Sequence, residues 1–310
     1  MPQTADEQTR GLLDMMAANP GPKLYELPIE VAREMLDQVA KSLDIEPTEV
    51  GNVEDITITG DEGSFTVRIY SPDGAGTGPL PALVMFHGGG FSMGSIDGHD
   101  NIARYICAKS GRKVVSVDYR LAPEHPFPTG LYDCNRAVEW LFENAAGLNV
   151  DTDKISLIGD SAGANLCAGV AQISNRNFQS LILLYPCCDL SLESSYASRD
   201  LYGGGDHFLS MEDVKWIMAN YAPHEDPENN SLLSPLKCTD LSGWPATLVI
   251  TAGMDLLRDE ALEFSEKLTA AGVDCRYSSY EGTIHGFVSF AGHIDQGKQC
   301  LDQICQYLTD

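Results

Sequence analysis

An apolar run leads directly into a Gly-x-Ser-x-Gly pattern in Ile155-Ser156-Leu157-Ile158-Gly159-Asp160-Ser161-Ala162-Gly163. The chain contains 29 glycines, so the pattern alone is weak evidence. The residues on either side make the pattern stronger evidence for a nucleophile. The run 155–158 predicts a strand and the small residues 164–168 predict a helix, and a sharp strand-to-helix turn exposes a nucleophilic serine. Glycines permit such a turn, and a helix N-terminus favours negative charge nearby. The alternative is a plain glycine-rich turn, and the context favours Ser161 as a nucleophile.

Short apolar runs alternate with helical segments along most of the chain. Such runs are typical of strands covered on both faces, and the alternation predicts a mostly parallel sheet with helices on both sides. The fold class is therefore α/β. A β-pair is predicted before this region, at 57–59 and 65–70, joined by a turn around Gly60 to Gly63. The other predicted elements are strands at 82–86, 113–117, 155–158, 181–185, 246–250 and 275–280, and helices near 99–110, at 130–146, from 161, at 259–271 and at 294–308.

Two regions fall outside this alternation. The first 50 residues are helical in pattern, with apolar residues at helical spacing from Leu36 to Leu43. Residues 190–243 hold no strong strand but include a helical piece near 211–221, and an insertion after a strand of an open α/β sheet lies at the ligand-binding edge. We predict a catalytic domain over 51–310, covered by a helical cap built from 1–50 and from the insertion at about 190–243. The alternative for the insertion is a surface excursion without a catalytic role.

A glycine run, His87-Gly88-Gly89-Gly90, stands at the end of another predicted strand. Consecutive glycines can turn adjacent backbone N–H groups toward an anion, and acyl transfer needs such donors for the oxyanion that forms on the substrate. A phosphate site is disfavoured, because the chain has neither Gly-x-Gly-x-x-Gly nor Gly-Lys-Ser/Thr here. A simple strand-end turn is the other alternative. The independent serine motif favours an oxyanion site.

A serine nucleophile needs a histidine base and an acid that orients it. Of the histidines after Ser161, His285 follows the last predicted strand, whereas the other three are explained as surface residues; these are His207, His224 and His293. Asp255 follows the strand 246–250 and is the predicted acid. Asp259 is the competitor, but it stands where a helix starts and has a role there as an N-cap.

The composition excludes several classes of partner. Asp and Glu number 45 against 20 Lys and Arg, for a net charge of -25, which disfavours nucleic acid and acidic membranes. The charge indicates a solubilising surface or, alternatively, adaptation to salt. Nine cysteines without a Cys-x-x-Cys spacing indicate neither a disulfide framework nor a zinc site, and favour reduced thiols in the cytoplasm. We expect neither a signal peptide nor a membrane span, because no basic and apolar leader pattern and no long apolar run occur in this sequence.

Five blocks of this sequence resemble the bacterial hormone-sensitive-lipase-type esterases, and they occur in that family's order. The blocks are His87-Gly88-Gly89-Gly90-Phe91, Tyr119-Arg120-Leu121-Ala122-Pro123-Glu124, Gly159-Asp160-Ser161-Ala162-Gly163, Asp255-Leu256-Leu257-Arg258-Asp259-Glu260 and His285-Gly286-Phe287.

The resemblance implies an α/β-hydrolase fold with an eight-stranded sheet and a helical cap. It implies hydrolysis of short- to medium-chain carboxylic esters without a cofactor or metal. It further implies Ser161 as nucleophile, Asp255 as acid and His285 as base. The implied oxyanion hole is formed by the N–H groups of Gly88, Gly89, Gly90 and Ala162. One departure is that the family usually has Asp-Pro-Leu where this chain has Asp255-Leu256-Leu257, so we expect a looser loop.

Two other functions use the same residues or the same fold. An amidase or aryl-formamide hydrolase would employ the same triad. A non-catalytic small-ligand receptor is disfavoured, because receptors of this fold have lost the histidine that this chain keeps at 285. The expected partner is a small-molecule ester, and a homodimer is the candidate assembly. Arg120, Glu124 and Asp160 are predicted to be structural.

Overall fold

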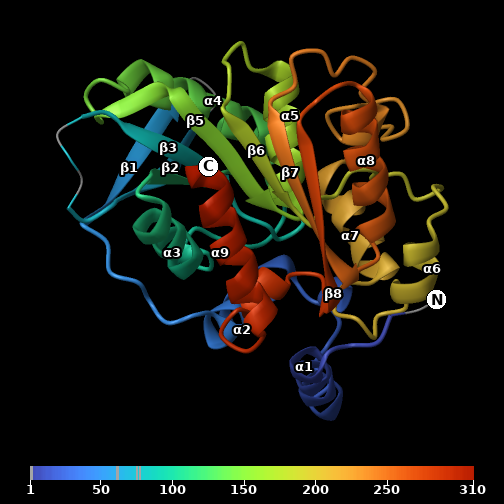
Figure 1. The fold of residues 1–310 in the computed structure, drawn as a ribbon. Helices are drawn as coiled ribbons and strands as arrows, with labels where there is room; N and C mark the ends of the chain where they lie inside the picture. The colour runs from blue at the N-terminus through green and yellow to red at the C-terminus, as the bar shows by residue number, and fades with distance from the viewer. Residues whose placement is uncertain (1–2, 61–62, 75, 77) are drawn as a thin grey trace.

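The chain folds around one sheet. The computed structural model describes residues 3–60, 63–74, 76 and 78–310. Within them the sheet has eight strands in the order β1-β2-β4-β3-β5-β6-β7-β8 (Figure 1). The strands are β1 Asn52–Gly60, β2 Gly63–Ser71, β3 Leu80–Phe86, β4 Lys113–Asp118, β5 Val150–Asp160, β6 Ser180–Leu184, β7 Ala246–Met254 and β8 Cys275–Ile284.

The direction of the strands gives the sheet a single functional edge. β1 pairs with β2, and β2 with β4, in antiparallel fashion, whereas all other neighbours are parallel. The mostly parallel eight-stranded sheet is thus confirmed. The carboxyl ends of β3, β5, β6, β7 and β8 meet at one edge, which is where ligands bind in open α/β sheets. The turn expected at Gly60 to Gly63 includes residues 61 and 62, which lie outside the described residues.

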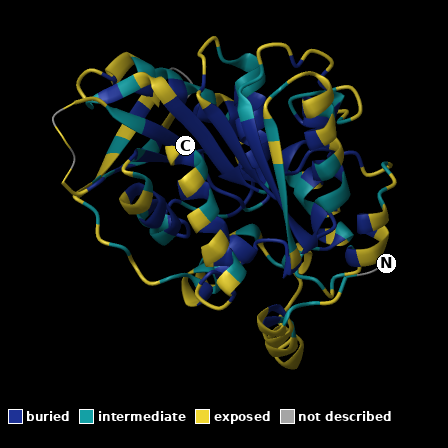
Figure 2. Ribbon diagram, in the orientation of Figure 1, coloured by how far each residue is buried: buried dark blue, intermediate teal, exposed yellow. Residues whose placement is uncertain are grey.

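Helices cover both faces of the sheet, which explains why its inner strands contain continuous apolar runs. Leu83 and Val84 of β3 and Val115 of β4 are completely buried, and Figure 2 shows these strands in the buried colour. In Figure 1, α3 and α9 lie in front of the sheet and α4 and α5 lie behind it. The covering helices are α3 Asp100–Ser110, α4 Thr129–Asn144, α5 Ala162–Ile173, α8 Arg258–Ala270 and α9 Asp295–Thr309.

Other helices occupy the two regions that break the strand–helix alternation. The predicted helix near 211–221 is present as α7, but α6 was not predicted. The helix α1 lies at the margin of the molecule and is largely exposed (Figure 2). The elements are α1 Glu7–Ala18, α2 Ile29–Leu43, α6 Ala197–Tyr202 and α7 Met211–Tyr221, with short 3-10 turns η1 Leu24–Glu26 and η2 Pro235–Lys237. A further 3-10 turn, η3 Phe287–Phe290, follows β8.

A buried ion pair joins the insertion to α8. Arg199 of α6 lies 2.7 Å from Glu260 of α8, and the two side chains are 6% and 0% exposed. The other carboxylate oxygen of Glu260 accepts the N–H groups of Cys188 and Asp189 at 2.9 and 3.0 Å. Burial raises the pKa of Glu260 to about 7, although Arg199 and these N–H groups oppose the rise. Glu260 therefore connects α6, α8 and the segment after β6.

The cysteines are free thiols, as their spacing predicted. All nine cysteines are free, and only Cys275 is not fully buried. Burial raises the pKa of several of these thiols; that of Cys107 rises to about 12. They therefore behave as small apolar side chains.

No helix in the described part of the chain has both the length and the apolar character needed to cross a membrane.

Candidate active site

Ser161 occupies a strained turn between β5 and α5. Its backbone has φ +54° and ψ −116°, a conformation that favours glycine, and its N–H donates to the carbonyl of Leu184 at 2.8 Å. The flanking glycines make the turn sterically possible. A Cβ on Gly163 would collide with the carbonyl oxygen of Phe86 at the end of β3, and a Cβ on Gly159 would collide with the backbone of Gly163. The motif therefore needs glycine at both positions for contact between neighbouring backbones.

Three side chains from different strand ends form a hydrogen-bonded row. Nε2 of His285, directly after β8, lies 2.9 Å from Oγ of Ser161, and Nδ1 lies 2.7 Å from Oδ2 of Asp255. Asp255 and His285 are only 1% and 6% exposed, so water competes little for these contacts. The three other candidate histidines lie elsewhere: His224 and His293 are exposed, and the ring of His207 contacts Tyr202.

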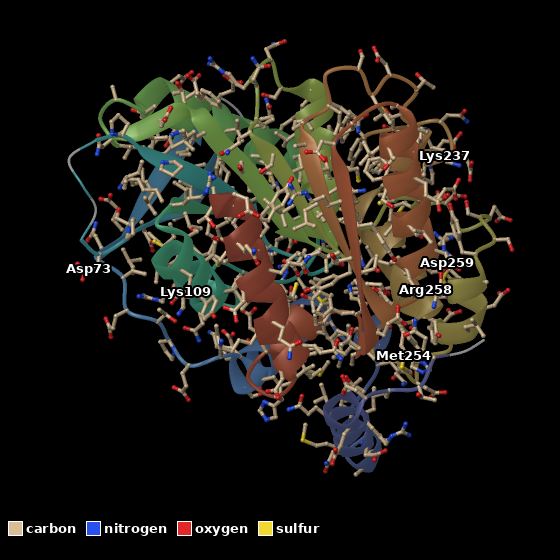
Figure 3. The ribbon with its side chains drawn as sticks, viewed as in Figure 1. Asp73, Lys109, Lys237, Met254, Arg258 and Asp259 are labelled. Carbon is tan, nitrogen blue, oxygen red and sulfur yellow. The ribbon has the colours of Figure 1, made fainter. Side chains whose placement is uncertain are left out.

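Asp255 sits in a three-residue loop between β7 and α8. Figure 3 labels the residues that bound it, Met254 on one side and Arg258 on the other. Oδ1 of Asp255 accepts the N–H of Leu257 at 3.0 Å, and Nη1 of Arg258 donates to the carbonyl of Gly253 at 3.1 Å. These bonds hold the loop at the position where the family usually has a proline.

The expectation that Asp259 caps α8 is wrong. The helix begins at Arg258, and Leu257 is its N-cap residue, without a side-chain capping bond. Asp259 therefore lies inside the first turn, where its Oδ2 accepts the N–H of Ser198 from α6 at 2.8 Å. It is a structural residue, as predicted, but through a contact with the insertion.

The glycine loop after β3 presents two of the expected oxyanion donors. The N–H of Gly88 is not one of them, because it donates to Oδ1 of Asp160 at 2.8 Å. This corrects the assignment of Gly88. Among the described residues, no intramolecular hydrogen bond uses the N–H of Gly89, Gly90 or Ala162. Gly89 and Gly90 have φ +117° and +61°, and all three residues border the cavity beside Ser161.

Contacts from other elements hold the glycine loop in place. The carbonyl of His87 accepts the hydroxyl of Tyr119 at 2.8 Å, and that of Gly89 accepts the N–H of Met93 at 2.9 Å. Nε of Arg33, from α2, donates to the carbonyl of Ser92 at 2.8 Å. The loop conformation therefore depends on β4 and on the N-terminal segment as well as on its own sequence.

Two arginines form ion pairs around the Tyr-Arg-Leu-Ala-Pro-Glu block, and only the pairing of Arg120 was expected. Nε and Nη2 of Arg120 bind Asp133 at 2.9 and 2.8 Å. Arg33 pairs with Glu124 at 2.6 Å. Both contacts fasten the segment after β4, to α4 in one case and to α2 in the other.

An apolar cavity of about 110 Å³ opens beside Ser161. Its walls come from the sheet edge, from the N-terminal segment and from the insertion. The N-terminal segment contributes Leu24, Leu36, Asp37, Val39 and Ala40; the insertion contributes Leu190, Phe208, Leu209, Asp213, Val214, Trp216 and Ile217. Both regions that were predicted to cover the site thus line it.

The family described as having the alpha/beta hydrolase fold matches residues 83–289, which include every strand-end residue named above. The chain belongs to the α/β-hydrolase fold family.

Relatives of this α/β-hydrolase are esterases. It is 38% identical over 276 residues to carboxylesterase NlhH of Mycobacterium tuberculosis, covering 85% of this chain and 83% of the relative. An ester hydrolase from the metagenome of Lake Arreo has a TM-score of 0.93 at 35% identity, covering 99% of this chain and 98% of its own. A hyperthermophilic esterase from Pyrobaculum calidifontis has a TM-score of 0.91 at 36% identity, covering 100% and 98%. They confirm the resemblance to hormone-sensitive-lipase-type esterases.

Sequence reasoning assigned no role to three side chains that shape the site of this α/β-hydrolase. Arg33 lies on a helix far away in sequence, and Tyr119 was seen only as part of a block. His99, at the start of α3, carries no local signal, because a single histidine before a helix is common. Only the fold brings them to the glycine loop.

Proposed function

We propose that this α/β-hydrolase is a serine carboxylesterase that hydrolyses short- to medium-chain carboxylic esters through an acyl-enzyme. The observation that carries the proposal is the row in which His285 lies 2.9 Å from Oγ of Ser161 and 2.7 Å from Asp255. The carboxylesterase relatives support the same chemistry.

The mechanism begins with proton transfer from Ser161. His285 accepts the proton at Nε2 as Oγ attacks the ester carbonyl. Asp255 keeps the other proton of the imidazole on Nδ1 and stabilises its charged form. The carbonyl oxygen becomes an oxyanion, which the N–H groups of Gly89, Gly90 and Ala162 bind, aided by the N-terminus of α5. His285 then protonates the leaving alcohol, and water hydrolyses the acyl-enzyme by the same route.

The cavity supports a preference for small esters. Its volume of about 110 Å³ is well below the roughly 300–1,000 Å³ of pockets that enclose drug-sized ligands. In this proposal residues 1–50 and about 190–243 form the cap that selects the ester, and 51–310 carry the catalytic domain. The free cysteines support a cytoplasmic location.

A chain-length series of nitrophenyl esters tests the proposal. We expect the highest kcat/KM for acetyl to hexanoyl chains, a decline for longer chains, and stoichiometric labelling of Ser161 by a fluorophosphonate. Absence of ester turnover together with absence of labelling would refute the carboxylesterase and favour a small-ligand receptor.

An amidase or aryl-formamide hydrolase remains the second candidate, because its residues would be the same. Matched ester and anilide substrates with one acyl group separate the two functions. We expect the ester to be cleaved much faster, and faster cleavage of the anilide would reverse the assignment.

A further inference from the structure

Asp160, which precedes Ser161, links the glycine loop to a buried histidine. Its Oδ1 accepts the N–H of Gly88 at 2.8 Å and lies 3.1 Å from Nε2 of His99. Asp160 and His99 are 8% and 7% exposed, so the pair is shielded from water. His99 is the residue before α3, and its Nδ1 lies 3.2 Å from the carbonyl oxygen of Ser95.

The position of Asp160 creates an electrostatic problem for the proposed reaction. Asp160 precedes Ser161 in the chain and borders the same cavity as Ser161 and the N–H groups that would receive the oxyanion. In a shielded site, two negative charges so close together repel each other far more strongly than in water. A buried carboxylate at this position would oppose the charge that develops in the transition state, unless a positive charge compensates it.

We propose that His99 is a positioning residue whose protonated imidazole neutralises Asp160, so that Asp160 can hold the Gly88 peptide without opposing the oxyanion. The inference rests on the proposed ester hydrolysis. His99 acts through Asp160 and the loop, and it does not touch the substrate's reacting atoms.

The groups facing His99 favour its charged form on balance. Burial is the largest single influence and lowers the pKa of His99, but Asp160, at the end of β5, and the other groups that face the imidazole together raise it above its ordinary value. Asp44, at the end of α2, adds to the rise; burial lifts the pKa of Asp44 itself to about 6. His87, at the end of β3, has its pKa lowered to about 4 by burial and by repulsion from His99.

The carboxylate of Asp100, which follows His99 in the chain, pairs with groups other than His99. Asp100 binds Arg104 and the hydroxyl of Tyr70, and it lies 3.3 Å from Arg68. Burial raises the pKa of Asp160, but His99 and the Gly88 N–H outweigh it and hold the value below normal. Both shifts favour the state in which a cation lies beside an anion.

A cycle of charge removal tests this role. The variants are His99→Gln, Asp160→Asn and the double variant, with His293→Gln as an exposed control, each measured as kcat and KM on one nitrophenyl ester. We expect His99→Gln to lower kcat by about tenfold or more with little change in KM, because it leaves the Asp160 charge uncompensated. Removing the Asp160 charge as well should restore kcat to within about threefold of the wild type.

Recovery in the double variant is the result that a packing role would not give. An unchanged kcat in His99→Gln, or a double variant no better than His99→Gln, would overturn the proposal. If His99→Gln fails to fold, the pH profiles of the wild type and the double variant decide. The kcat of the wild type should fall at alkaline pH as His99 loses its proton, and the double variant should lack this fall; identical alkaline limbs would overturn the proposal.

Failure of the proposed function would look different. In that case the wild type would neither hydrolyse the ester nor accept the fluorophosphonate. Failure of this inference alone would leave wild-type turnover and labelling intact.

Discussion

Oδ2 of Asp255 lies 2.7 Å from Nδ1 of His285. The other oxygen of this buried carboxylate accepts the N–H of Leu257, so both oxygens have fixed partners. This arrangement orients the imidazole with Nε2 toward Ser161. The loop of Asp255 thereby holds the acid in place. Substitutions can therefore distinguish the role of Asp255 from that of nearby carboxylates.

We expect Asp255→Asn to reduce kcat by about 10⁴-fold, because an amide would stabilise the wrong imidazole tautomer and would not balance its charge. Asp259→Asn is the matched control, four residues along the same segment. It should keep most of the activity, since Asp259 binds Ser198 and not the histidine. Steady-state kinetics on a nitrophenyl ester distinguish the two, and a larger loss in Asp259→Asn would contradict the assignment of the acid.

Ser161 is the site of a second prediction, because its backbone is strained. Ser161→Ala and Ser161→Gly should each lower kcat by about 10⁵–10⁶-fold. Glycine should also raise the free energy of unfolding by roughly 1 kcal/mol relative to alanine, because it adopts φ +54° without the steric cost of a Cβ. Urea unfolding of the two inactive variants measures this difference, and equal stabilities would show that the turn stores no strain.

A third prediction concerns Gly163. Gly163→Ala would push a Cβ into the carbonyl oxygen of Phe86, a backbone atom that cannot move aside. We expect a loss of more than about 3 kcal/mol in the free energy of unfolding, or failure to fold. Gly11→Ala is the control: no atom lies within 4 Å of its added Cβ, and a helical alanine should gain roughly 0.5–1 kcal/mol. A well-folded, fully active Gly163→Ala variant would argue against the close approach of α5 to β3.

Much of this fold could be predicted because its signals are local. Apolar runs gave the buried strands, and the order of motifs gave Ser161, Asp255 and His285 at successive strand ends. Element limits were less accurate: β5 begins at Val150, five residues before its apolar run, because polar residues occupy the first part of the strand. The helix α6 was missed because its six residues are too few to show a period.

The errors at the site have a different cause. Which N–H of the glycine run stays free depends on where the side chain of Asp160 points, and no local pattern reports that. The same holds for His99 and Arg33, whose contacts join residues 59 or more positions apart. Sequence predicts which backbone groups are available, whereas the three-dimensional packing selects among them.

The fourth prediction uses the pKa of Glu260, which burial raises from 4.5 to about 7. A raised folded-state pKa contributes stability that is full below about pH 4.5 and is lost as pH rises through about 7. Glu260→Gln cannot titrate and so lacks this pH dependence, which means that any deficit in its free energy of unfolding relative to the wild type should be smaller at pH 8 than at pH 5. Glu266→Gln, exposed on the same helix, should show no such trend. Urea unfolding at the two pH values measures both, and a deficit that grows with pH would contradict the burial argument.

Arg33 has a consequence for how this protein can change over evolutionary time. One guanidinium on α2 binds the carbonyls of Ser92 and Ala122 and the carboxylate of Glu124. A mutation that reshapes the N-terminal segment for a new substrate therefore also disturbs the loop that carries Gly89 and Gly90. Substrate selectivity and the rate of turnover are thus expected to change together. Chimeras that exchange this segment between related esterases should keep Arg33 and Glu124 from the same parent.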